Sequence, residues 1–485
     1  MIMNLNMSIT EAKGLPEAER KMLQRLLQIH AAHAPANELK RRYYEGHIQL
    51  SEVNLGLALP DNISKLEIGC AWGEKAVDVL AARSMFDGFV GANGEDAGLM
   101  TQIAAQNRTI AEYMKASKEE LKYGCSFATL SADRSLELEG AKQGCRIRFH
   151  TPENAAAEWD GEKGRIGCGF AVIAIDEDPQ TGERKPTIVH LHTDEALWVI
   201  QRGFDDYDWR AKKYPHIMGR PLMEPLIWNA TSAKPFGRSR LKEPERRLMQ
   251  SYVRTVCNAT IGLEFATSPQ KYLLGITDEQ YEKVINDKFR QYVGSIIAGT
   301  WNPETGEKPT FGQLQQGTIS PHIEMLRSLA ASFAAATHIP VTEFGVVTEA
   351  NPTSSDAILA QSQELVALAE QLNTGNGDSL KMIAMMAQAI ALDVPLSGLS
   401  EEQTAVVPHF KNPAMPSVAV TADAAIKIAT AREGFGQTDV FLEMIGFDQA
   451  DIRRIKAQES RNRGLGFLNE ITETETTETG TGENA

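Results

Sequence analysis

Cysteine and long apolar runs are scarce in this sequence, and each shortage excludes a class of protein. The 485 residues include five cysteines, an odd number, and no CxxC pair. Neither a disulfide framework nor a zinc knuckle fits this pattern, so we expect reduced, mostly buried thiols. No stretch approaches the ~20 apolar residues of a membrane helix, and the N-terminus lacks a basic region followed by an apolar run. We therefore expect a soluble, non-secreted protein with no membrane partner.

Complete sets of catalytic or metal-binding residues are also missing. The sequence has no GxSxG, HExxH or EF-hand motif, and GANGEDAG at 91–98 lacks the Lys-Ser/Thr of a phosphate-binding loop. His190 and His192 share one face of a predicted strand, but no further cluster completes a metal site. We expect a half-exposed strand face there, and a non-enzymatic protein with no metal or cofactor.

One glycine motif leaves an enzymatic alternative open. LEIGCAWG at 66–73 resembles the first motif of S-adenosylmethionine-dependent methyltransferases, whose glycines let the backbone approach the ligand. Ala71 stands where that family has its central glycine, and the residues that follow do not alternate between strands and helices. We favour a loop that leads into a packed helix, with a methyltransferase-like enzyme as the alternative.

Positive charge is the third shortage. The formal net charge is −15 and the pI is near 5.3. Proteins that grip DNA neutralise its phosphates with Lys and Arg, so this acidity argues against a DNA-gripping surface. Residues 328–380 contain six acids and no Lys or Arg, and residues 469–485 contain five Glu and no Lys or Arg. We expect the low-complexity tail at 466–485 to be disordered.

The residues that are present form an α+β pattern. Helical spacing predicts helices at 16–34, 74–84 and 99–122, and short apolar or alternating runs over 125–200 predict antiparallel strands and hairpins. Later helices are predicted at 245–265, 321–338, 354–373, 379–392, 421–433 and 437–458. Two long helices thus flank an insert at 267–319, and a loop at 340–353 leads to the next helix.

Several segments, taken in order, resemble the portal proteins of long-tailed bacteriophages. They are YYEG at 43–46, AVDVLAARSMFDGFVG at 76–91, ELKYGCSFATL at 120–130, RFHTPENAAAEWD at 148–160, MGRPLMEPLIWN at 218–229, KPFGRSRL at 234–241, YLLGI at 272–276 and HIPVTEFG at 338–345. Their order and spacing over about residues 40–465 carry the resemblance, because no single motif is specific. CAWG at 70–73 and the GANGED turn depart from the family's pattern.

The resemblance implies a portal fold with a β-rich wing, two stem helices, a small α/β clip and a helical crown. It assigns 1–238 to the wing, 239–266 and 320–338 to the stem, 267–319 to the clip, 339–353 to the tunnel loop, 354–377 to a long helix, 378–465 to the crown and 466–485 to the acidic tail. The same order of helix, insert, helix, loop and helix follows from the hydrophobic pattern alone.

The resemblance also implies a function and partners. A portal is a ring, usually a homododecamer, at one vertex of the capsid in the virion, assembled in the host cytoplasm. It is a conduit for double-stranded DNA during packaging and ejection, without sequence-specific binding. Its implied partners are the terminase large subunit, the major capsid and scaffolding proteins, and the head–tail connector or adaptor. No catalytic residues are carried over.

The acidic interval suggests which residues line the channel. A ring of acidic loops repels phosphate over about 8 Å without capturing it, which suits a conduit. We predict that the tunnel loop places five residues nearest the channel: Glu343, Phe344, Val346, Val347 and Glu349. An ordinary acidic helix face with no DNA nearby is the open alternative.

Basic residues gather elsewhere. Three clip residues, Lys283, Lys288 and Arg290, are candidates for contact with terminase or adaptor. Others lie at 238–247, and these two groups either form intersubunit and terminase contacts or are solvated surface pairs with the interleaved acids.

The first stem helix has two adjacent apolar rows. The pairs that form these rows are Leu248/Met249, Tyr252/Val253 and Val256/Cys257. A single chain cannot bury both rows alone, so we expect neighbouring subunits to cover them.

Overall fold

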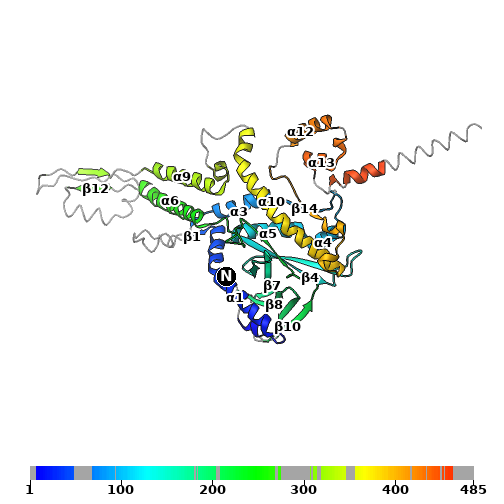
Figure 1. The fold of residues 1–485 in the computed structure, drawn as a ribbon. Helices are drawn as coiled ribbons and strands as arrows, with labels where there is room; N and C mark the ends of the chain where they lie inside the picture. The colour runs from blue at the N-terminus through cyan, green and yellow to red at the C-terminus, as the bar shows by residue number, and fades with distance from the viewer. Residues whose placement is uncertain are drawn as a thin grey trace, which may run out of the picture. The chain divides into compact units, whose positions relative to one another are not determined.

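The computed structural model (Figure 1) divides into two units. It describes residues 7–48, 68–92, 94–177, 179, 182, 184–203, 208–267, 271–274, 306, 310–313, 318–345, 355–414, 418–432, 434–447, 451–452 and 454–462. Unit 1 comprises Met1–Asn37, Asp78–Ser239 and Ser362–Ala485, and unit 2 comprises Glu38–Val77 and Arg240–Gln361. The mixture of helix and sheet confirms the α+β class.

Two antiparallel sheets form the middle of unit 1, as the runs over 125–200 predict. The first sheet has the strand order β10-β9-β8-β7-β6 and the second has the order β11-β4-β5. Their bounds are β4 Cys125–Asp133, β5 Gly144–His150, β6 Ala155–Asp160, β7 Arg165–Glu177, β8 Arg184–His192, β9 Ala196–Arg202, β10 Trp209–Pro215 and β11 Met223–Ile227.

The faces of the five-stranded sheet are covered by different partners. Phe170, Leu191 and Trp198 belong to one buried cluster with residues of η1 (Met7–Glu11) and α1 (Glu17–Tyr44). Ala171 belongs to another cluster, together with Met223 of the three-stranded sheet. Alternation along β7 thus places Phe170 toward the helices and Ala171 toward the second sheet.

His190 and His192 lie on the face that carries the small residues, because they pair across the sheet with Ala171 and Gly169. The prediction of a half-exposed strand face is wrong here: the exposed fractions are 8% and 0%. Burial lowers the pKa of His190 to about 3, lowers that of His150 on β5 to about 4, and lowers the pKa of His192 well below its usual value. The layer between the sheets therefore contains neutral imidazoles.

The N-terminal helices differ in extent from the prediction. α1 continues to Tyr44, well past the predicted end at 34. The single helix expected over 99–122 is two helices, α4 (Leu99–Asn107) and α5 (Thr109–Tyr123), because Arg108 adopts a left-handed conformation with φ 51°. α3 (Trp72–Arg83) agrees with the predicted helix at 74–84.

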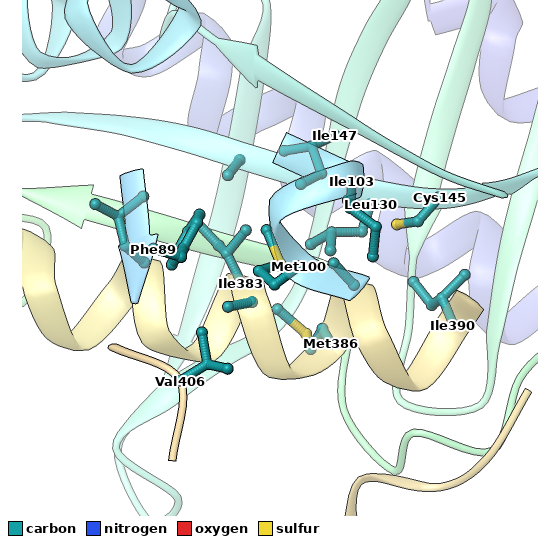
Figure 2. Close-up of a cluster of buried hydrophobic side chains, with 14 of the residues drawn as sticks. Phe89, Met100, Ile103, Leu130, Cys145, Ile147, Ile383, Met386, Ile390 and Val406 are labelled. Carbon is teal, nitrogen blue, oxygen red and sulfur yellow. The ribbon is translucent and has the colours of Figure 1, made fainter. Parts of the chain in front are cut away.

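α10 (Ser355–Leu392) is one helix where two were predicted, so the boundary expected at 377 falls inside it. Its buried residues keep a helical spacing across that point: Leu365, Ala369, Leu372, Asn376, Leu380, Ile383, Ala387 and Ile390. Figure 2 shows Ile383, Met386 and Ile390 facing Met100 and Ile103. The second half of α10 is therefore part of the core of unit 1.

A buried polar network holds α10 to α5. The Nδ2 of Asn376 donates to Glu120 Oε2 at 2.8 Å and to the Tyr113 hydroxyl at 3.0 Å. The same hydroxyl lies 3.0 Å from the Ser84 hydroxyl. Burial raises the pKa of Glu120 to about 8, so this carboxyl is largely protonated at neutral pH.

Further elements of unit 1 come after α10, among them η4 (Leu396–Gly398), α11 (Glu401–Thr404) and η5 (Phe435–Gln437). β14 (Val407–Phe410) pairs with β3 (Phe86–Val90), and α12 (Val418–Ala431) and α13 (Asp439–Ile445) come next. α13 stops at Gly446, which has φ 107°, so the helix predicted over 437–458 is interrupted. The acidic tail lies outside the described residues.

Unit 2 is built on a pair of helices, α6 (Glu243–Thr267) and α9 (Ser320–Thr337), close to the predicted stem ranges. Between them the structure describes the antiparallel pair β12 (Lys271–Leu274) and β13 (Thr310–Gln313). A second pair, β1 (His47–Ile48) and β2 (Ile68–Gly69), precedes α3. Most other residues of the predicted clip lie outside the described ones.

Candidate functional site at the end of the helix pair

Only two of the predicted channel residues, Glu343 and Phe344, lie within the described part of the chain. Both belong to η3 (Val341–Phe344), a short helix between Pro340 and Gly345. The other predicted channel residues and the predicted clip residues lie outside the described residues: Val346, Val347, Glu349, Lys283, Lys288 and Arg290. The candidate site is therefore the place where the chain leaves α9 and enters the predicted loop.

α9 ends through a local backbone signal. His338 adopts a left-handed conformation with φ 55°, and Ile339 donates its N–H to the carbonyl of Ala334. Pro340 then cannot continue the helix, because it has no N–H to donate. These residues turn the chain into η3, and Gly345, with φ 73°, ends that short helix.

Four aromatic side chains meet at this turn. The ring of Trp72, at the start of α3, lies 4.3 Å from Tyr252 of α6, 5.0 Å from Phe333 of α9 and 5.8 Å from Phe344 of η3. Phe333 and Phe344 are themselves 5.5 Å apart in an edge-to-face arrangement. We call these four residues the Trp72 cluster. Such pairs add to the free energy of apolar burial, and here they join α3 and α6 to the consecutive segments α9 and η3.

Glu343 has a basic partner in the same unit. The Nζ of Lys75, one turn along α3 from Trp72, lies 2.9 Å from Glu343 Oε2. Half of the Glu343 side chain remains exposed, at 50%, so the pair contributes little to stability. Its effect is to neutralise one of the six acids of the Lys/Arg-free interval and to orient η3 toward α3.

A buried arginine makes a third connection between α3 and the end of α9. Arg240 donates from Nε to the carbonyl of Ala76 and from Nη2 to the carbonyl of Thr337, both at 2.6 Å. Burial lowers the pKa of this guanidinium to about 10, with Glu245 acting in the opposite direction, so it stays charged at neutral pH. The expectation that the basic residues near 238–247 all form surface or intersubunit pairs is wrong for Arg240.

Glycine at position 73 is explained by close packing. A Cβ there would lie 2.1 Å from the carbonyl oxygen of Tyr43, which no side chain can tolerate. β2, which precedes it, is a two-residue strand paired antiparallel with β1, whereas the methyltransferase motif needs a strand of a parallel sheet. Gly73, the second glycine of the 66–73 motif, thus serves helix packing in the described structure.

Nearby thiol chemistry is suppressed. Burial raises the pKa of Cys70 to about 11, so its thiol stays protonated at neutral pH, and burial also raises the pKa of Tyr252. All five cysteines are free and buried, as expected. Within the described ranges, no cluster of three or more His, Cys, Asp or Glu side chains could hold a metal ion.

The sequence pattern pointed to η3 but missed Trp72, Lys75 and Arg240. The signal for Trp72 was the CAWG segment, which departs from the portal family's pattern, and Arg240 stood among the basic residues of 238–247. The structure explains that departure, because Trp72 fills the space between the two long helices and η3.

The helix pair buries only one of the two predicted rows of α6. Met249, Val253 and Cys257 are 0–3% exposed, together with Glu245 at 5%. Leu248, Tyr252 and Val256 of the neighbouring row remain half-buried. Toward the far end of the pair, Leu263, Ile323 and Met325 are 46–49% exposed.

Comparison with known proteins gives distant structural similarities only. No family model and no curated protein matches the sequence. Among solved structures, a chain from the neck of a native GTA particle with C12 symmetry is 13% identical, with a TM-score of 0.42, covering 78% of this chain and 89% of that chain. A chain from the neck of an empty GTA particle with C6 symmetry is also 13% identical, with a TM-score of 0.45, covering 76% and 87%. Similarity at this level does not identify the family.

No helix in the described part of the chain has both the length and the apolarity to cross a membrane.

Proposed function

We propose that this protein is a portal-type subunit that forms a ring at the vertex of a phage-like particle and encloses a channel for duplex DNA. The order of elements along the chain supports the proposal: α6, an insert with β12 and β13, α9, η3 and then α10. The portal resemblance implies this order. Terminase, capsid and scaffolding proteins, and a head–tail connector are the proposed partners.

The half-buried row on α6 is the observation that carries the proposal. Apolar side chains at helical spacing that their own unit does not cover are typical of surfaces that associate. In a closed ring every subunit offers the same two surfaces to its neighbours, so a heterologous contact repeats until the ring closes. Trp72 covers part of Tyr252, but the described residues of unit 2 leave Leu248 and Val256 only half-buried. Farther along the same helix pair, Leu263, Ile323 and Met325 are 46–49% exposed.

Mass photometry and negative-stain microscopy of the purified full-length chain test the ring. The wild-type protein should form a closed ring with a central hole wide enough for duplex DNA. Val256→Glu places a charge in the half-buried row and should leave single subunits, because burial of an unpaired carboxylate at the contact is unfavourable. Asn258→Glu, at an exposed position of the same helix, is the matched control and should still form rings. An exclusively monomeric wild-type protein at all concentrations would contradict the proposal.

A further inference from the structure

We propose that Trp72 and Lys75 are positioning residues that set the direction in which the chain leaves η3 for the predicted loop. Neither residue belongs to the predicted channel set, and both lie at the start of α3. The meaning of that direction for DNA passage rests on the proposed function. The anchoring itself is a property of unit 2 that can be measured separately.

Three contacts from α3 converge on the junction of α9 and η3. Trp72 packs against Phe333 before the turn and against Phe344 after it. Lys75 pairs with Glu343. Arg240 donates hydrogen bonds both to the carbonyl of Ala76 in α3 and to the carbonyl of Thr337, the last residue of α9. Contacts on both sides of a turn fix its angle, whereas a contact on one side leaves the following segment free to rotate.

The three contacts differ in their burial and in the segment that they reach, so they have different roles. Arg240 is buried, and its hydrogen bonds to the carbonyls of Ala76 and Thr337 hold the end of α9. The Trp72 cluster and the Lys75–Glu343 pair reach η3 itself and therefore determine where Gly345 lies. The pair is half-exposed, so its effect is on orientation rather than on overall stability.

Phe344 consequently has a different role from the one predicted from sequence alone. Its ring lies against Trp72 and Phe333, and its side chain is half-buried within its own unit. It is the anchor of η3, just before the predicted loop. Glu343 is the second anchor, through Lys75.

Quenching of a fluorophore by tryptophan measures this anchoring directly. Thr342→Cys gives an exposed labelling site in η3, and the five native cysteines are buried. Bimane attached there should be quenched by Trp72, and Trp72→Phe should abolish the quenching while keeping an aromatic ring in place. Both variants are measured on the full-length chain.

The anchor variants should then move the fluorophore away from Trp72. Phe344→Ala and Lys75→Ala should each raise bimane emission toward the level of the Trp72→Phe background. The exchange Lys75→Glu with Glu343→Lys should restore the quenching, which a purely structural effect on folding does not predict. Arg247→Ala removes an exposed ion pair of the same unit with Glu243 and should leave the emission unchanged.

Unchanged quenching in both Phe344→Ala and Lys75→Ala, with circular dichroism confirming folded protein, would overturn the inference. The outcome is independent of ring formation, because the readout lies within one unit of one chain. If no ring forms while the quenching behaves as expected, the proposed function fails and the anchor stands. If rings form and the quenching does not respond, the anchor fails and the proposed function stands.

Discussion

The two units bury their side chains in contrasting ways. Unit 1 closes large apolar clusters on both faces of its five-stranded sheet and around α10, and it even encloses imidazoles and a carboxyl. The helix pair of unit 2 buries one row of α6 and leaves the adjacent row half-buried, with Leu263, Ile323 and Met325 exposed. Unit 1 thus has the character of a self-sufficient scaffold, whereas unit 2 has surfaces suited to contact with other copies.

The difference extends to buried charge. In unit 2 the charged Arg240 is paired with two carbonyl oxygens and lies near Glu245. In unit 1 burial instead neutralises His150, His190 and Glu120 at neutral pH. A buried charge fixes geometry through directed hydrogen bonds, and a buried neutral group makes stability depend on pH. The following predictions test each side of this contrast.

The largest effect is expected from Arg240→Ala. The change leaves the carbonyls of Ala76 and Thr337 without their donor and leaves Glu245 buried without the opposing charge. Loss of one partner from a buried charged contact costs about 3–5 kcal/mol of the free energy of unfolding. Arg247→Ala, which removes an exposed pair with Glu243, should change it by less than about 1 kcal/mol. Denaturant unfolding measures both, and similar effects in the two variants would contradict the special role of Arg240.

The second effect concerns pH and unit 1. Folded Glu120, with a pKa of about 8, keeps its proton, whereas the unfolded chain releases it above the usual value of 4.5. Acidification from pH 7 to pH 5 therefore favours the folded wild-type protein at this residue, by about 2.5 kcal/mol at ~1.4 kcal/mol per pH unit. The Glu120→Gln variant lacks this gain. Its free energy of unfolding relative to wild type should therefore fall by about 2.5 kcal/mol between pH 7 and pH 5. Denaturant unfolding at both pH values measures the difference.

His190 provides a control with the opposite sign. Below its ordinary pKa of 6.5 the unfolded chain binds a proton there, whereas the folded state, with a pKa of about 3, does not. Wild type therefore loses about 2 kcal/mol at this residue between pH 7 and pH 5, and His190→Leu should gain that much relative to wild type. Shifts of the same sign in the two variants would show that titration at these sites does not control the pH dependence.

The sequence predicted the helices of unit 2 and the hairpins of unit 1 because both follow from local hydrophobic periodicity. It did not predict the break at Arg108 or the continuity of α10 through Gly375 and Gly377, because tertiary contacts decide them. Asn376 between those glycines is held by Glu120 and Tyr113, which no local pattern reveals. The burial of His190 has the same origin, since the covering sheet is formed by strands distant in sequence.

The candidate site shows the same limit. The order of segments located η3, but the residues that hold it are Trp72 and Lys75 of α3 and Phe333 of α9. Trp72 departed from the family's pattern, and a departure alone does not say what the residue contacts. Arg240 resembled its exposed neighbours in the sequence, and only the fold distinguishes it from Arg247.

The smallest expected change in stability comes from substituting one helical glycine in each unit, which allows a direct comparison of the two units. A Cβ at Gly262 of α6 would meet nothing within 4 Å, and one at Gly375 of α10 would approach only the carbonyl of Ile227, at 3.9 Å. Alanine in a helix interior is favoured over glycine by up to ~1 kcal/mol, so both Gly262→Ala and Gly375→Ala should stabilise the protein slightly. Hydrogen exchange of each helix measures the gain locally. In single subunits, Gly375→Ala could slow exchange while Gly262→Ala does not. If Gly262→Ala then slows exchange only in rings, α6 depends on neighbouring subunits for its order.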